Sequence, residues 1–310
     1  MRNKRVLVTG GAGFIGSNLA NRLAADNDVI AVDDTYLGTP ENLVDDVAFV
    51  EASVLDDDYP VDVDVVFHLA ALSSRNMHES DPQRGCRVNV EGFVNTVERA
   101  RKEGCDTVVY ASTSSIYGSR TEPSPVDMDV EAHTAYEASK LARERYAEYY
   151  ANHHDMNMAG LRFFSVYQGF GGNEGHKGEY ANTVAQFADA IASGEAPELF
   201  GDGSQTRDFT HVDDVARACE LAVDEELTGV YNVGTEEAYS FNEMVELIND
   251  ALGTEVDPEY VECPFDGYVH DTMADASEFH DATGWEPEID FAEGVERVCA
   301  PYIEGAREIT

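Results

Sequence analysis

Basic residues are scarce in this chain of 310 residues: 20 lysines and arginines stand against 61 aspartates and glutamates, for a formal net charge of −41. The carboxylates are spread along the whole chain and form no acidic tail. A nucleic-acid duplex would be repelled, which argues against nucleic-acid binding. A folded chain of this charge repels itself unless salt screens it, and the screening length is about 3 Å at 1 M salt. We therefore expect a protein adapted to a high-salt cytoplasm; the alternative is a merely acidic mesophilic protein.

Cysteine pairs, a leader segment and long apolar runs are also missing. The five cysteines include no Cys-x-x-Cys pair. We therefore expect reduced thiols, and we expect neither a disulfide framework nor a metal site. The first residues lead straight into a predicted strand, which indicates no signal peptide. No apolar run approaches the roughly 18 residues of a membrane span. With 43% hydrophobic and 10% aromatic residues, the composition predicts a globular cytoplasmic protein that does not enter a membrane.

The first half of the sequence alternates short β-rich runs with helical patterns. Apolar residues at four-residue spacing, namely Ile15, Leu19 and Leu23, predict a helix. Asp81 before Pro82 is typical of a helix start. This alternation predicts an α/β fold with a doubly wound, parallel, Rossmann-type sheet. The predicted strands are 5–9, 29–32, 48–50, 65–69 and 107–110, and the predicted helices are 14–25, 82–102 and 134–152.

The pattern changes at about Gly169, where a glycine-rich loop covers 169–178. Ser240 and Glu243 have the spacing of a capping box and predict the start of another helix. No repeat or low-complexity linker divides the chain. We expect one large lobe and a smaller, discontinuous carboxyl-terminal α/β lobe. The other predicted elements are helices over 182–193, 212–224 and 292–304 and strands over 198–200 and 230–233.

A glycine-rich turn lies between the first predicted strand and the first predicted helix. Its glycines, Gly10, Gly13 and Gly16, permit a tight turn, close approach of a diphosphate and close helix–strand packing. The amino terminus of the helix then faces the phosphates. Asp33 ends the second strand, where a carboxylate accepts hydrogen bonds from a ribose 2′-hydroxyl and repels a 2′-phosphate. The pattern favours NAD over NADP; the alternative is a structural glycine turn with an incidental aspartate.

The run from Thr9 to Gly16, TGGAGFIG, resembles the extended branch of the short-chain dehydrogenase/reductase family. The resemblance covers essentially the whole chain. It implies an NAD-binding Rossmann domain over 1–168 and 208–238 and a nucleotide-sugar-binding lobe over 169–207 and 239–310. Ser53 departs from the family, which usually has an aspartate there on adenine, and His68 is expected to pack or cap. The implied cofactor-binding residues are Gly10, Gly13, Phe14, Ile15, Gly16, Asp33, Asp34, Ser53, Val54, Leu69, Ala70, Ala71, Asn89, Ser112, Tyr136, Lys140 and Phe164.

Tyr136 and Lys140 are four residues apart within a predicted helix and therefore share one of its faces. A free tyrosine has a pKa of about 10 and is a poor base at neutral pH. A nearby ammonium and the positive nicotinamide ring would favour the phenolate. Tyr136 could then remove a proton from a sugar hydroxyl while hydride leaves the same carbon for NAD. Together with the glycine turn, this pair predicts catalysis.

A third catalytic group is expected on the loop after the strand at 107–110. The resemblance implies Thr113, which stands five residues before Gly118, with Ser112 and Ser114 as close competitors. Related 4,6-dehydratases carry an Asp-Glu pair after this threonine, and decarboxylating relatives carry a glutamate. This chain has Ser114 and Ser115 instead. Elimination therefore looks unfavourable, and epimerisation through a 4-keto sugar is expected.

Several segments of the second half resemble the family's substrate-binding motifs. Arg207, in the run GDGSQTRDFTHVDD, is expected on the substrate diphosphate; the alternative is a structural pair with Asp208. Lys177 is expected to serve as a second acid/base or to contact phosphate, unless it is a solvated loop residue. Residues 264–275 lack the arginine that many 4-epimerases carry there. The implied substrate-binding residues are Thr113, Ser114, Ser165, Lys177, Asn182, Arg207, Tyr268 and His270.

These features predict an NAD-dependent nucleotide-sugar epimerase, most similar to UDP-glucose 4-epimerases, that acts on UDP-glucose and UDP-galactose or their N-acetyl forms. A 6-epimerase, dehydratase or reductase on the same scaffold is the second hypothesis. A non-catalytic NAD(H)-sensing module is the third, and the intact residues Thr113, Tyr136 and Lys140 argue against it. The resemblance also implies a homodimer formed through the helices at 82–102 and 134–152.

Overall fold

The computed structural model describes residues 1–265 and 267–309. Its centre is a seven-stranded sheet in the order β11-β6-β5-β4-β1-β2-β3, in which every pair of neighbours is parallel. The strand order reverses between β1 and β4, so a crevice is expected at their carboxyl ends. The Rossmann-type prediction is confirmed. The strands are β1 Arg5–Thr9, β2 Asp28–Asp33, β3 Ala48–Glu51, β4 Val65–His68, β5 Thr107–Ala111, β6 Asn157–Phe163 and β11 Gly229–Val233.

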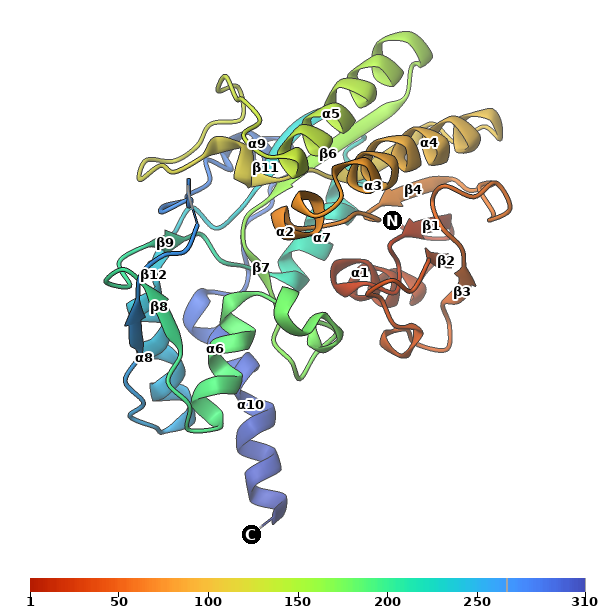
Figure 1. Ribbon diagram of the computed structural model, residues 1–310. Coiled ribbons are helices and arrows are strands. Elements are labelled where there is room, and N and C mark those ends of the chain that lie inside the picture. Colours follow the sequence, from red (N-terminus) through yellow and green to blue (C-terminus); the bar gives the residue numbers. More distant parts are fainter. Residues whose placement is uncertain (266, 310) are drawn as a thin grey trace.

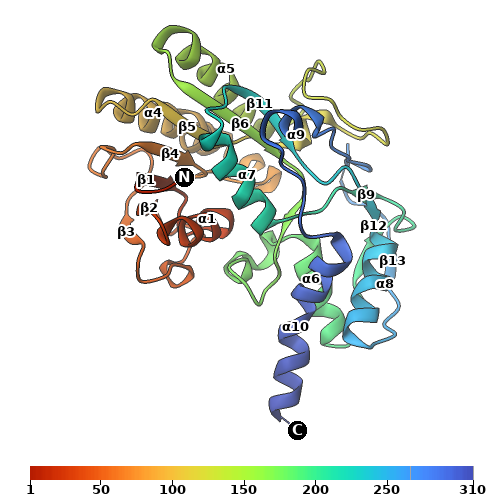
Figure 2. The same ribbon diagram turned by 180° about the vertical axis from the view of Figure 1, so that it is seen from behind.

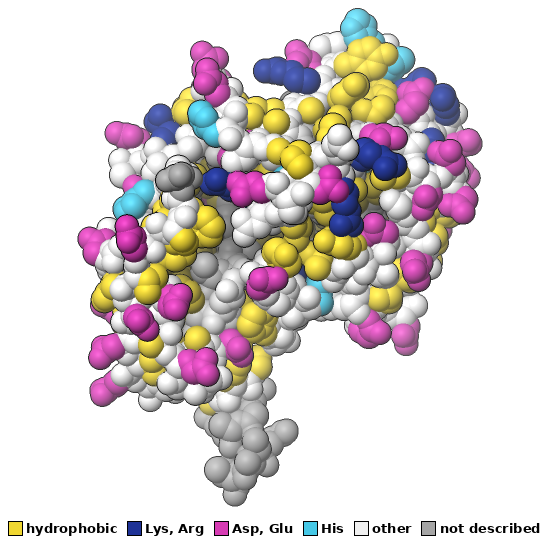
Figure 3. All heavy atoms as spheres, in the orientation of Figure 1, with side chains coloured by type: hydrophobic (Ala, Val, Ile, Leu, Met, Phe, Trp, Pro, Cys, Tyr) yellow, Lys and Arg dark blue, Asp and Glu magenta, His cyan; other side chains and the backbone are white. Residues whose placement is uncertain are grey.

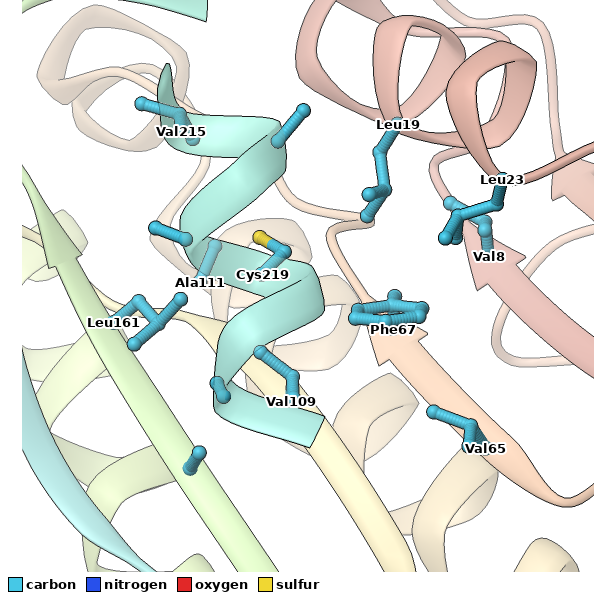
Figure 4. Close-up of a cluster of buried hydrophobic side chains, with 14 of the residues drawn as sticks. Val8, Leu19, Leu23, Val65, Phe67, Val109, Ala111, Leu161, Val215 and Cys219 are labelled. Atoms are coloured by element: carbon cyan, nitrogen blue, oxygen red, sulfur yellow. The ribbon is translucent and has the colours of Figure 1, made fainter. Parts of the chain in front are cut away.

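Helices cover both faces of this sheet because successive residues of its buried strands point to opposite sides. On one face, Val8 and Phe67 pack under α1 (Phe14–Ala24) and α7 (Val212–Asp224), as Figure 4 shows. On the other face, Leu7 and Val66 pack under α4 (Gly92–Lys102) and α5 (Ala135–His154). The two cores hold the strand ends rigidly, which gives the crevice fixed walls.

A second, smaller group of elements lies at one end of the sheet (Figures 1 and 2). Its own apolar core contains Phe187, Leu199, Phe241 and Val295. No helix within the described residues has the length and apolar character that a membrane span needs. This group comprises α6 Thr183–Ala192, β8 Glu198–Phe200, β9 Thr206–Arg207, β12 Tyr239–Ser240, α8 Phe241–Leu252, β13 Glu259–Val261 and α10 Phe291–Ile309. The remaining short elements are η1 Pro40–Asn42, α2 Arg75–Glu79, η3 Ser114–Tyr117, β7 Val166–Tyr167, η4 Gly175–Tyr180, β10 Thr210–His211 and α9 Ser277–Thr283.

The predicted helix over 82–102 is interrupted. It consists of α3 (Pro82–Cys86), a π-helical turn η2 (Arg87–Glu91) and α4. The π turn carries Asn89, whose side chain accepts from the Leu72 amide at 2.8 Å and donates to Ser139 Oγ at 2.9 Å. The extra residue of the π turn is therefore associated with a polar link between the loop after β4 and helix α5.

The predicted helix starts are confirmed. Asp81 accepts from the Arg84 amide, and Ser240 forms a capping box with Glu243. A capping box that was not predicted begins α5, where Thr134 and Glu137 exchange hydrogen bonds with each other's backbone. This box fixes the first turn of α5, which carries Tyr136.

Candidate active site

A cleft of about 530 Å³ opens at the carboxyl ends of β1, β2, β4 and β5, and Figure 3 shows the hollow on this face of the molecule. The cleft brings together residues far apart in the sequence. Those of the predicted site residues that line it are Gly10, Gly13, Phe14, Ile15, Gly16, Asp33, Asp34, Val54, Leu69, Ala70, Ala71, Ser112, Thr113, Ser114, Tyr136, Lys140, Ser165, Lys177 and Arg207.

The glycine turn forms a cradle that side chains would fill. Gly10 has φ +67°, and a Cβ on it would lie 2.7 Å from the Ala70 nitrogen. A Cβ on Gly16 would overlap the carbonyl oxygen of Gly10. No side chain caps the first turn of α1, whose N-cap is Gly13. The amides at this helix start are therefore open to an anion, and the residues fit the diphosphate of a dinucleotide.

Asp33 supports the same turn. Its carboxylate accepts from the Ala12 amide at 3.2 Å and the Thr35 amide at 2.9 Å. Burial raises the pKa of this carboxyl above its usual value. Asp33 thus ties the loop after β2 to the glycine turn, and its contact with ribose stays a prediction.

The catalytic residues expected from sequence lie on one face of α5 and on the loop after β5. Lys140 Nζ donates to the Ala111 carbonyl oxygen at 3.0 Å and lies 5.7 Å from the centroid of the Tyr136 ring. Thr113, which is buried, caps η3 through the Ser115 amide. The Thr113 side chain lies near enough to the Tyr136 hydroxyl to lower the pKa of that phenol. The three side chains therefore share one corner of the cleft.

The ionisation of this corner differs from the expectation that a lysine ammonium favours the phenolate. Burial raises the pKa of Tyr136, and the hydrogen bond from Thr113 and the charge of Arg143 oppose that rise. Burial also holds the pKa of Lys140 well below its usual value, with a further contribution from the Arg143 charge. In the chain without cofactor, burial therefore disfavours both the Tyr136 phenolate and the Lys140 ammonium, because each charge would be removed from water.

A buried ion pair supports helix α5, which carries Tyr136 and Lys140. Arg162 on β6 donates from Nε and Nη2 to the two carboxylate oxygens of Glu144 on α5, at 2.9 and 2.8 Å. Ser112 Oγ donates to the same carboxylate at 2.5 Å. The side chains of Glu144 and Arg162 are 8% and 6% exposed. This network fixes Ser112, next to Thr113, and the helix that carries Tyr136 and Lys140.

Arg207 lines the cleft from the smaller group of elements. Its guanidinium donates to three backbone carbonyls, those of Thr206, Val269 and His270, and lies 5.3 Å from the Tyr268 ring centroid. The predicted structural pair with Asp208 is wrong. Asp208 is fully buried and instead accepts from the amides of Thr235, Glu236 and Ala274 and from the Thr235 hydroxyl.

Some predicted site residues do not line the cleft. Asn182 caps α6 through the Val184 amide, and Asn89 lies in the polar link to Ser139. Phe164 stacks on Tyr117 behind the cleft wall. His68 is fully buried and bonded to Thr9, as expected for a packing residue. The predicted residues outside the lining are Ser53, Asn89, Phe164, Asn182, Tyr268 and His270.

Lys177 does line the cleft, at the glycine-turn end. Its ammonium lies 5.5 Å from the centroid of the Phe14 ring. Burial lowers its pKa. Within the described residues, this ammonium has no hydrogen bond and no ion pair with a carboxylate, although the chain holds 61 of them. Lys177 is thus not the solvated loop residue that was one alternative.

Tyr36, Arg84 and His176 are among the residues of the cleft wall that sequence reasoning missed. The Arg84 guanidinium lies 3.9 Å from the centroid of the Tyr36 ring. No local pattern signals this contact, because it joins the loop after β2 to a helix some fifty residues later. Within the described residues, no group of histidine, cysteine or carboxylate side chains could hold a metal ion.

The sequence of the sheet and its cleft matches a known family. The model of the "NAD dependent epimerase/dehydratase family" matches residues 6–234. The chain belongs to this family. A UDP-glucose 4-epimerase of Mycolicibacterium smegmatis is 37% identical over 305 residues, which cover 94% of this chain and 96% of that protein. A UDP-N-acetyl-alpha-D-glucosaminuronate decarboxylase of Bacillus cytotoxicus is 31% identical over 91% of this chain and 94% of its own length.

Solved structures of the epimerase/dehydratase type superpose on nearly the whole chain. The UDP-N-acetylglucosamine 4-epimerase of Methanobrevibacter ruminantium, in complex with UDP-N-acetylmuramic acid, has a TM-score of 0.91 at 29% identity and covers 98% of this chain and 100% of that one. The UDP-glucose 4-epimerase of Thermus thermophilus, in complex with NAD, has 0.84 at 30%, with 96% and 99% covered. The ADP-L-glycero-D-manno-heptose-6-epimerase of Helicobacter pylori has 0.86 at 28%, with 97% of each chain covered.

These matches support an NAD-dependent nucleotide-sugar epimerase and therefore an enzyme, in place of a non-catalytic sensing module. NAD is the cofactor of the family and is bound in the solved relative from Thermus thermophilus. The glycine cradle and the uncapped start of α1 fit that cofactor.

Proposed function

We propose that this enzyme epimerises UDP-glucose and UDP-galactose, or their N-acetyl forms, at C4. The observation that carries the proposal is the shared corner of Thr113, Tyr136 and Lys140 beside the glycine cradle. The loop after β5 has Ser114 and Ser115 in the cleft where an elimination would need a carboxylate acid or base. A hydroxyl, a tyrosine and a lysine are sufficient for oxidation at a sugar carbon and its reversal.

Each residue then has a defined task. Tyr136 takes the proton of the C4 hydroxyl and later returns it, and Thr113 holds the same oxygen and the Tyr136 hydroxyl in line. Lys140 donates to the Ala111 carbonyl at 3.0 Å and lies on the same face of α5 as Tyr136. From there it helps to set the protonation state of the tyrosine. NAD, when bound, supplies the acceptor and later donor of the hydride. Between the two hydride transfers the 4-keto sugar rotates in the cleft and presents its other face. No net redox change results.

The direct test uses the purified enzyme in molar KCl. It is incubated separately with UDP-glucose, UDP-galactose and their N-acetyl forms, and the sugars are followed by NMR. Interconversion at C4 would establish the activity and name the substrate pair. If none of the four sugars is converted while NAD is still bound, the C4 proposal is wrong.

A 6-epimerase is the second candidate, and Lys177 is the observation that favours it. A cleft ammonium with a lowered pKa and, within the described residues, no hydrogen bond or ion pair could act as a second acid/base beside Tyr136. Lys177→Met should then stop turnover of a nucleotide heptose while Lys177→Arg fails to restore it. A C4 epimerase would tolerate both variants far better.

Arg207 is proposed to hold the substrate diphosphate. We expect Arg207→Leu to raise KM for the UDP-sugar by about 10- to 100-fold with a smaller change in kcat, because charge-assisted hydrogen bonds contribute about 1.5–3 kcal/mol each. Initial rates over a range of sugar concentrations separate the two constants. Arg207→Lys keeps the charge, so its KM should lie between that of the unmodified enzyme and that of Arg207→Leu. Thermal unfolding shows whether loss of the three carbonyl contacts destabilises the fold. An unchanged KM in a stable Arg207→Leu variant would contradict this role.

We further propose that the enzyme is a homodimer formed through α4 and α5. Tyr146 and Tyr149, three residues apart on α5, are 43% and 47% exposed and offer an aromatic patch that a second subunit could cover. Sedimentation equilibrium in high salt should give twice the mass of one chain. Tyr146→Glu together with Tyr149→Glu should shift the mass to one chain, and a single-chain mass for the unmodified protein would contradict the proposal.

The charge supports the proposal that the protein works in a high-salt cytoplasm. Figure 3 shows carboxylates over the whole visible face, and the formal charge is −41. We expect the thermal midpoint to rise steadily between 0.1 and 2 M KCl, because the screening length falls from about 10 Å at 0.1 M to about 3 Å at 1 M. Sucrose, which is excluded from protein surfaces but does not screen charge, is the control. A thermal midpoint that does not change with KCl concentration would contradict the proposed adaptation to high salt.

A further inference from the structure

The glycine-rich segment 168–177 connects the smaller group of elements to the NAD-binding side of the cleft. Its first contact is a pair of reciprocal amide hydrogen bonds. Asn18 Nδ2 on α1 donates to Gln168 Oε1 at 3.0 Å, and Gln168 Nε2 donates back to Asn18 Oδ1 at 2.8 Å. Both groups are neutral, and both side chains are half-buried. The pair joins residues 150 positions apart in the sequence.

A second set of contacts joins the other end of the segment to the same side. Asn173 Nδ2 donates to Ser17 Oγ on α1 at 3.1 Å and to the Asn42 carbonyl of η1 at 3.2 Å. Asn42 Nδ2 in turn lies 3.0 Å from His176 Nδ1 and 3.1 Å from the Ala12 carbonyl oxygen. Burial lowers the pKa of His176. The segment is therefore bound at two places.

The segment is also held in shape from within. Glu174 is completely buried, and its carboxylate accepts from the amides of Gln168, Gly169 and Asn182 at 2.9, 2.9 and 2.6 Å. Gln168 Oε1 also accepts from the Asn173 amide at 2.9 Å. Amide bonds to a buried carboxylate are among the strong hydrogen bonds of proteins. The segment is thus a preformed loop that fits onto α1 and η1.

The place of these contacts gives them a function. Ala12 lies within the glycine turn, and Ser17 and Asn18 directly follow it on α1, while His176 and Lys177 line the cleft above Phe14. We propose that residues 168–177 form a clasp over the diphosphate end of the NAD site, and that this clasp, through Asn18, Gln168 and Asn173, retains NAD between turnovers. Its contacts to α1 and η1 are made by neutral groups, so high salt does not screen them.

Retention is useful to an enzyme that must return hydride to the same sugar. If the cofactor left between the two hydride transfers, it would leave as NADH. The sugar would then be released as a ketone. This consequence depends on the proposed epimerisation. The clasp itself depends only on NAD binding, so its test needs no sugar.

The experiment measures the release of bound NAD from the holoenzyme in molar KCl. Enzyme loaded with radiolabelled NAD is mixed with a large excess of unlabelled NAD, and retained label is followed by rapid filtration. We expect release to be about 10-fold faster in Gln168→Ala and in Asn173→Ala, because each loses at least two hydrogen bonds across the clasp. Asn18→Ala combined with Gln168→Ala should add little to either single change, because both remove the same pair.

The matched control is Asn27→Ala, just beyond the end of the same helix. Asn27 donates to the Leu23 carbonyl and accepts from the Lys4 amide, and it bonds neither residues 168–177 nor their partners Ser17, Asn18 and Asn42. Its release rate should equal that of the unmodified enzyme. Gln168→Glu is the variant to use if Gln168→Ala fails to fold, because it keeps the side-chain length and sets a carboxylate against Asn18 Oδ1. It should also release NAD faster.

Two results would overturn the clasp. One is an unchanged release rate in folded Gln168 and Asn173 variants whose thermal midpoints match that of the unmodified protein. The other is faster release only in Arg84→Ala, which removes the Arg84–Tyr36 contact at a different part of the cleft wall. That result would place the exit of NAD at Arg84 and leave residues 168–177 with a structural role alone.

Discussion

Replacement of Tyr136 by phenylalanine should slow epimerisation by about 10²- to 10⁴-fold, the range expected for loss of a general acid–base group. The hydroxyl is the only group removed, and it lies in the corner of the cleft that also holds Thr113 and Lys140. The phenyl ring can keep its packing, including the edge contact with His78 at 5.6 Å between ring centroids. The loss should therefore appear in kcat, with NAD still bound and the fold intact.

The measurement is the rate of C4 interconversion by NMR, with bound NAD determined after denaturation of the same sample. Tyr260→Phe is the matched control, because it makes the same change at an exposed position outside the cleft and outside the proposed dimer helices. It should retain full activity. If Tyr136→Phe kept more than a tenth of the rate, the tyrosine would not be the proton carrier and Lys177 would be the next residue to replace.

The glycine turn and the Tyr136–Lys140 spacing could be predicted from sequence because both depend on local geometry. A turn between a strand and a helix, and two residues on one helix face, need no knowledge of the rest of the fold. The alternation of strands and helices likewise predicted the parallel sheet, and its reversal between β1 and β4 places the cleft. What these features share is a short distance along the chain.

The contacts that sequence reasoning missed or misjudged join distant segments. The Gln168–Asn18 pair and the Arg84–Tyr36 contact have no local pattern. Asp208 was considered as a partner of its neighbour Arg207, but adjacent residues of an extended strand point to opposite sides, and its carboxylate meets the amides of Thr235 and Ala274 instead. Burial, which depends on the whole fold, raises the pKa of Tyr136 in the chain without cofactor, and no local pattern could predict that effect.

Glu144→Gln should lower the free energy of unfolding by about 3–5 kcal/mol, because it breaks a buried ion pair. The change leaves the Arg162 guanidinium buried, with a neutral amide in place of the two carboxylate oxygens that it bonds at 2.9 and 2.8 Å. Ser112 loses the charged acceptor of its hydroxyl. Denaturant unfolding in constant high salt measures the change.

The control for this prediction is the double variant Glu144→Met with Arg162→Met. Removal of both charges leaves no unpaired ion, so the double variant should be more stable than Glu144→Gln alone. Activity should not follow stability. Because Glu144 holds Ser112 beside Thr113 and lies two turns beyond Tyr136 on α5, the double variant should still lose part of kcat when its fold is recovered. A Glu144→Gln variant as stable as the unmodified enzyme would show that the existing bonds of Arg162 Nη1 to the Tyr117 hydroxyl and the Val126 carbonyl are enough to hold the guanidinium.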